Sequence, residues 1–132
     1  MNTPQRKIII GVLGSGNGSN FQAIARAAAA GAIPARIACV LSDVPGAFIL
    51  ERARALGIPA EHFSPAPFKT KLDGQAELQV MARLAHYGVE LVVLAGFMLM
   101  IKGRLLAAYP RRIVNIHPSL LPAFPGLEAW QQ

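Results

Sequence analysis

Apolar and polar residues form two kinds of block along this chain. Short runs rich in β-branched residues predict strands, and longer stretches with apolar residues three or four positions apart predict amphipathic helices. The two kinds alternate, which predicts repeated β-α-β units. The predicted strands lie at 7–14, 35–42, 59–63, 89–96 and 111–117, and the predicted helices lie at 21–30, 47–57 and 75–88.

Some of the predicted strands are apolar along their whole length, as at 8–13 and 91–95. Such strands are typical of a parallel sheet whose two faces are both covered by helices. We therefore predict a doubly wound, Rossmann-like α/β fold with a mostly parallel sheet. The length of 132 residues and the hydrophobic content of 53% indicate one domain, 1–132, with its own core.

Local signals mark where the predicted helices begin and end. Gly31, Gly57 and Gly88 follow the helical patterns as stop signals, and Asn20 is predicted to cap the first helix. The segment 65–74, which contains two prolines, is predicted to be a surface loop.

Composition excludes several classes of protein. No apolar run approaches the roughly 20 residues of a membrane helix, and the amino-terminal run lacks a signal cleavage site, so we expect a cytoplasmic protein with no membrane partner. The single cysteine, Cys39, lies within an apolar run and is expected to be a buried thiol.

The net charge of +6 favours anionic partners, either nucleic acid or small phosphorylated molecules. The basic residues are scattered along the chain rather than gathered in a stripe. We therefore expect no nucleic-acid partner.

A glycine-rich loop, 14–20, follows the first predicted strand and precedes the first predicted helix. Backbone N–H groups and the helix dipole converge there, and Ser19 and Asn20 add side-chain donors, so the loop is a candidate phosphate site. It lacks the ending of a nucleoside-triphosphate loop and the third glycine of the dinucleotide fingerprint. Two alternatives stay open: a merely tight turn, and a dinucleotide site in which Asp43 holds a ribose.

Asn115 and His117 come at the end of the last predicted strand, where parallel sheets carry their chemistry. Because successive side chains of a strand point to opposite faces, these two residues, two positions apart, point to the same side. An amide donor and an imidazole could then flank one reacting carbonyl. A purely structural histidine is the alternative. His62 and His86 have no metal-ligand spacing to each other or to His117, and we predict no metal.

Three segments together resemble one family of enzymes. They are SGNGSNFQAI at 15–24, VVLAGFMLMI at 92–101 and VNIHPSLLPAFPGLEAW at 114–130. The family is phosphoribosylglycinamide formyltransferase, and the resemblance covers nearly the whole chain. Relatives that formylate initiator tRNA or hydrolyse formyltetrahydrofolate share the fold, but Pro118 directly after the histidine resembles the purine enzyme.

The resemblance implies transfer of a formyl group from 10-formyltetrahydrofolate to the amine of glycinamide ribonucleotide, in purine biosynthesis. The implied catalytic residues are Asn115 and His117. The implied substrate-binding residues are Gly18, Ser19, Asn20 and Pro118. The implied folate-binding residues are Lys71, Met98, Leu99, Met100, Ile101 and Asn115. Leu99 and Lys71 stand where arginines are expected.

The family also uses an aspartate downstream of the histidine, and this chain ends before that aspartate. We therefore expect a chain that lacks the carboxyl-terminal part of the family's fold. Two other functions stay open: a nucleotide- or dinucleotide-binding domain, and an inactive binding module of the same superfamily. A homo-oligomer is allowed by the sequence.

Overall fold

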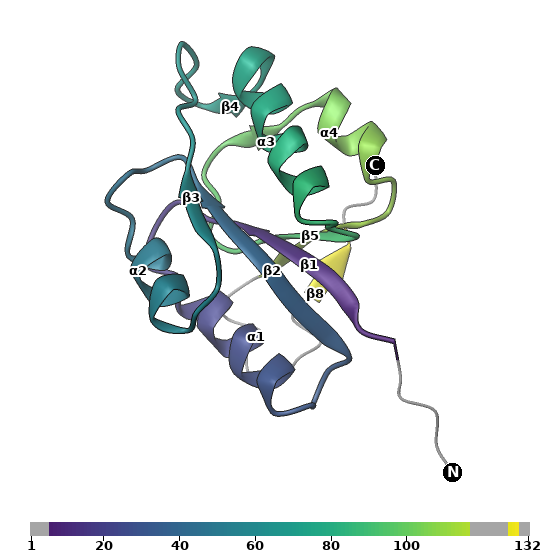
Figure 1. Ribbon diagram of the computed structural model, residues 1–132. Helices are drawn as coiled ribbons and strands as arrows, with labels where there is room; N and C mark the ends of the chain where they lie inside the picture. The colour runs from purple at the N-terminus through teal and green to yellow at the C-terminus, as the bar shows by residue number, and fades with distance from the viewer. Residues whose placement is uncertain (1–5, 117–126, 130–132) are drawn as a thin grey trace.

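The computed structural model describes residues 6–116 and 127–129, and its main feature is a six-stranded sheet (Figure 1). The strand order is β3-β2-β1-β5-β7-β8. Neighbouring strands run parallel from β3 to β7, and only β8 is antiparallel to its neighbour. The strands are β1 (Ile8–Leu13), β2 (Ala35–Ser42), β3 (Ala60–His62), β5 (Leu91–Leu94), β7 (Ile113–Ile116) and β8 (Leu127–Ala129).

Helices cover both faces of this sheet, as Figure 1 shows. The pair α1 and α2 packs on one face and the pair α3 and α4 packs on the other, each over its own apolar cluster. The prediction of a doubly wound α/β fold is therefore confirmed. The helices are α1 (Ser19–Ala29), α2 (Phe48–Ala55), α3 (Gly74–His86) and α4 (Gly103–Ala108).

Side chains of β1 point alternately to the two faces of the sheet, so the strand contributes to both apolar clusters. Val12 packs with Phe21 of α1 on one face, and Leu13 packs with Leu84 of α3 on the other; all four are fully buried. Gly11 lies so close to the α3 layer that an added Cβ would come within 2.8 Å of the Leu84 side chain. The β1 strand therefore needs a residue without a side chain at this position.

Most helix ends agree with the sequence, and one does not. Gly31, Gly57 and Gly88 all have positive φ just beyond a helix, which confirms them as stop signals. The prediction that Asn20 caps the first helix is wrong. Gly18 is the cap residue, because its φ of 84° lets the chain enter the helix at Ser19, and no side chain caps this end.

A second, two-stranded parallel sheet pairs β4 (Lys71–Leu72) with β6 (Met100–Ile101). The predicted surface loop at 65–74 thus contains a short strand in its second half. Asp73 then caps α3 by accepting a hydrogen bond from Gly74 N at 2.8 Å. This small sheet ties the loop to the segment that follows β5.

Two further expectations concern burial and membranes. Cys39 is fully buried as predicted, and burial raises the pKa of its thiol to about 12. Within residues 6–116 and 127–129, no helix has the length and apolar character needed to cross a bilayer.

Candidate functional site

The strand order places the loops after β1 and β5 side by side. From β1 the chain continues to β2 on one side, and from β5 it continues toward β7 on the other side. Ligands of open α/β sheets bind where the strand order reverses in this way, beyond the carboxyl ends of the strands. Gly14 lies tight against the end of β5, because a Cβ there would come within 2.8 Å of the Ala95 carbonyl oxygen. The glycine loop therefore begins at the expected binding edge.

The glycine loop is held by α2 as well as by the sheet. Ile49 N donates to the Gly16 carbonyl oxygen at 2.9 Å, and a Cβ on Gly18 would come within 2.7 Å of Ile49. Gly18 is buried, whereas Ser19 is exposed and Asn20 is half-buried. Their backbone groups open α1, and the first N–H groups of a helix have no partner within it, which is the geometry of an anion site.

Arg52 of α2 braces the same loop. Its guanidinium donates to the Asn17 carbonyl oxygen and to Asn17 Oδ1, both at 2.8 Å, and to Gln22 of α1. The guanidinium also lies over the Phe48 ring, 4.7 Å from its centroid. The arginine thus adds positive charge beside the opening of α1 and fixes the loop in one shape, a role that the sequence did not reveal.

We expect Arg52→Ala to lower the affinity of this loop for inorganic phosphate by about tenfold, because both the brace and a nearby positive charge are lost. Titration calorimetry measures the change. Arg54→Ala is the matched control: it removes the same charge from the same helix, but among the described residues Arg54 forms an ion pair only with Glu51, at 3.6 Å. Equal losses in the two variants would show that net charge, rather than the brace, governs binding.

Ser15 connects the glycine loop to two other strand ends. Its buried hydroxyl donates to Asp43 Oδ1 at 2.7 Å and accepts from Met98 N at 2.9 Å. Asp43 follows β2 and Met98 follows β5. One oxygen of Asp43 is therefore engaged within the protein, whereas the open alternative from the sequence used this carboxylate for a ribose.

A cavity of about 530 Å³ lies beyond the carboxyl ends of β5 and β7. It brings together five residues that the resemblance implies for folate binding and four residues that the sequence did not indicate. The implied residues are Met98, Leu99, Met100, Ile101 and Asn115, and the others are Thr70, Leu94, Phe97 and Leu106. The wall is mainly apolar and contains one side-chain amide, that of Asn115.

The residues of this wall differ in exposure. Met98 and Met100 are 77% and 64% exposed, whereas Leu99 is buried in the core under α3 and α4. Two large apolar side chains thus stand open to solvent at the cavity. They offer apolar surface to a ligand that enters the cavity.

Lys71 is not among the residues that line the cavity, although its strand pairs with Met100. Its ammonium group lies 3.6 Å from Asp73 Oδ2 and 4.5 Å from the centre of the Phe68 ring. The backbone N–H of Gly74, more than Lys71, holds the pKa of the Asp73 carboxyl below its usual range. The implied folate role of Lys71 stays a prediction.

Asn115 lies at the carboxyl end of β7, in register with Leu94 of β5 and Glu128 of β8. Its side chain is half-buried and faces the cavity. His117 and Pro118 lie outside the described residues, so their implied roles and the pairing of His117 with Asn115 stay predictions. Among the residues that the structure describes, no group of three metal-binding side chains is present.

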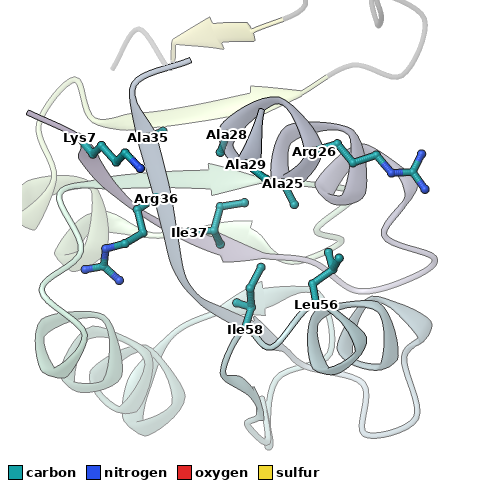
Figure 2. Close-up of a pocket in the computed structure, with 10 residues that line it drawn as sticks. All are labelled: Lys7, Ala25, Arg26, Ala28, Ala29, Ala35, Arg36, Ile37, Leu56 and Ile58. Carbon is teal, nitrogen blue, oxygen red and sulfur yellow. The ribbon is translucent and has the colours of Figure 1, made fainter. Parts of the chain in front are cut away.

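A second hollow of about 300 Å³ lies at the amino ends of β1 and β2, away from this edge (Figure 2). Its lining includes Ile37 and Ile58, and Arg26 and Arg36 extend from it in opposite directions. None of the site residues implied by the sequence lines it.

Known proteins resemble this chain in sequence and in structure. The family model described as formyl transferase matches residues 6–132. The chain is 44% identical over 118 residues to the phosphoribosylglycinamide formyltransferase of Bacillus subtilis, covering 89% of this chain and 60% of that protein. It is 41% identical over 121 residues to the Escherichia coli enzyme of the same name, covering 92% and 56%.

Solved structures give the same picture. Glycinamide ribonucleotide transformylase 1 from Symbiobacterium toebii superposes with a TM-score of 0.78 at 50% identity, covering 91% of this chain and 56% of that one. Phosphoribosylglycinamide formyltransferase from Brucella melitensis gives a TM-score of 0.78 at 40% identity, covering 92% and 62%. The chain thus spans only 56–62% of the length of these four relatives.

Proposed function

Because the chain belongs to the formyl transferase family, we propose that it carries out formyl transfer from 10-formyltetrahydrofolate to the amine of glycinamide ribonucleotide. One observation carries the proposal. Asn115 and the segment 98–101 line a single cavity, and the first residue of that segment is hydrogen-bonded to the glycine loop. A site for a phosphorylated amine and a site for a folate would then adjoin each other.

The proposed site for the ribonucleotide phosphate is the opening of α1. Gly18, Ser19 and Asn20 supply the N–H groups there, and Arg52 adds positive charge beside them. This is a site for a phosphate on a small molecule, since the N–H groups converge on one point instead of following a groove.

The proposed folate site is the 530 Å³ cavity. The exposed side chains of Met98 and Met100 offer apolar surface to a flat ring system, and methionine adapts to the shape of what it contacts. Lys71, one strand away, offers a positive charge to an acidic group of the folate. Covering the two methionines would remove apolar surface from water and so favour binding.

The proposed reaction joins the amine nitrogen to the formyl carbon and breaks the bond from that carbon to N10 of the folate, with one proton passing from the amine to N10. The Asn115 amide N–H stabilises the oxyanion of the tetrahedral intermediate. His117, from its position in the sequence, assists the proton transfer. No step of this proposed reaction uses a metal ion or a covalent enzyme intermediate.

Titration of the 132-residue chain tests the proposal. Glycinamide ribonucleotide and a non-reactive folate analogue should each bind, and formyl transfer should follow with the reactive donor. NAD binding without folate binding would instead support a dinucleotide domain. Formate release without the ribonucleotide would indicate a hydrolase. Binding of both ligands without turnover would contradict formyl transfer by this chain and leave a binding module.

A further inference from the structure

The Ser15 hydroxyl lies where three loops meet at the carboxyl edge of the sheet. Ser15 belongs to the glycine loop, Asp43 follows β2, and Met98 begins the cavity wall after β5. The hydroxyl bonds to both of the others, at 2.7 Å and 2.9 Å, and Ser15 N donates to the Gly96 carbonyl oxygen at 3.2 Å. A single residue therefore joins the two halves of the candidate site.

These two bonds need a group that both donates and accepts, as the Ser15 hydroxyl does. Only a group that donates and accepts at once can bond to a carboxylate on one side and to a backbone N–H on the other. Ser15 is just 8% exposed, so water does not readily replace a lost bond. Without the hydroxyl, the Met98 N–H would lose its acceptor in a partly buried place, at a cost typical of an unpaired donor.

Asp43 sets the direction of the Ser15 hydroxyl. Because the carboxylate oxygen accepts the hydroxyl proton, the oxygen lone pairs are turned toward Met98 N. The N–H of Met98 in turn fixes where the wall segment 98–101 begins. The carboxylate thus acts on the cavity wall through the serine, although it does not line the cavity itself.

We propose that Ser15, oriented by Asp43, is a positioning residue that holds the phosphate-binding loop and the folate-binding wall in register. The inference rests on the proposed function, because it assigns the two ligands to these two halves. Ser15 itself contacts neither ligand in this proposal. It sets the distance between the amine, anchored by its phosphate at the opening of α1, and the formyl group above Asn115.

Loss of this link should impair the reaction more than the binding of either ligand. Each half of the site keeps its own contacts, but a displacement of about 1 Å between reacting groups can lower a rate by about 10²-fold. We expect Ser15→Ala to lower kcat by about 10- to 100-fold and to leave the dissociation constants of the ribonucleotide and of the folate analogue close to those of the unaltered chain.

Asp43 variants and a neighbouring serine provide matched controls. Asp43→Leu should reproduce the Ser15→Ala effect, whereas Asp43→Asn keeps an oxygen acceptor for the hydroxyl and should retain most of the activity. Ser42→Ala removes another buried hydroxyl, one that accepts from Val44 N at 3.1 Å, and should leave kcat unchanged. If Ser42→Ala lost as much kcat as Ser15→Ala, the loss in Ser15→Ala would be due to general destabilisation. That result would overturn the inference.

Amide hydrogen exchange tests the link without relying on turnover. In the unaltered chain, glycinamide ribonucleotide should slow exchange both at 14–20 and at 96–101; in Ser15→Ala it should slow exchange only at 14–20. Equal slowing at 96–101 in both proteins would overturn the inference. If the ribonucleotide leaves 14–20 unchanged even in the unaltered chain, the proposed phosphate site is wrong, which is a different failure.

Discussion

Replacement of Asn115 by alanine is expected to lower kcat for formyl transfer by about 10²- to 10³-fold, the usual cost of removing one donor to an oxyanion. The side chain faces the cavity, and its strand is held on both sides by backbone pairing that the substitution leaves intact. The chain should therefore stay folded and keep its affinity for glycinamide ribonucleotide. Single-turnover kinetics with the ribonucleotide and the reactive donor measure the change.

Asn115→Asp serves as the control for shape, since it has the same size but no N–H to donate. It should be as slow as the alanine variant. An aspartate variant with unaltered kcat would contradict the oxyanion role. From the sequence, His117→Ala should likewise abolish transfer while sparing substrate binding, and unchanged turnover would refute that assignment.

Replacement of Gly18 by alanine is expected to destabilise the chain by about 2–5 kcal/mol and to abolish phosphate binding. Two costs add: a non-glycine residue at positive φ costs about 1–2 kcal/mol, and overpacking costs about 1–3 kcal/mol. Here φ is 84° and the new Cβ would come within 2.7 Å of the Ile49 backbone. To relieve this clash, Gly18 and Ile49 must move apart. The N–H groups that open α1 are then displaced as well.

Alanine substitutions at two other glycines separate the cost of positive φ from the cost of overpacking. Gly31 has positive φ but open space around it, so Gly31→Ala should show the backbone cost alone. Gly16 has open space and no positive φ, and Gly16→Ala should leave stability nearly unchanged. Urea unfolding followed by circular dichroism measures all three variants. A Gly18→Ala loss no greater than that of Gly31→Ala would mean that the contact with Ile49 is easily relieved.

The fold was largely predictable because its signals are local. The whole-length apolar strands and the glycines after helices depend on residues close together in sequence, and these predictions are confirmed. The β4–β6 pair was missed, since two residues give no periodicity and the partners lie 29 positions apart. The cap was misassigned because a positive φ at Gly18, which sequence does not specify, moves the start of α1 by two residues, from 21 to 19.

The candidate site was predictable in part for the same reason. The stretch 98–101 and Asn115 could be named from motifs, and the structure brings them to one cavity. Arg52 and the Ser15–Asp43 link could not be named, because each joins segments that are distant along the chain. A polar residue in an apolar or glycine-rich context, such as Ser15, was the only available signal.

The burial of Cys39 has a practical consequence for experiments in solution. The chain has one cysteine, and its thiol stays protonated at neutral pH because its pKa is about 12. Thiol-directed dyes react through the thiolate, so the native chain is effectively silent toward them. A cysteine introduced at the exposed Met98 position would take up a fluorophore at that point alone, and its emission would report directly on what enters the cavity.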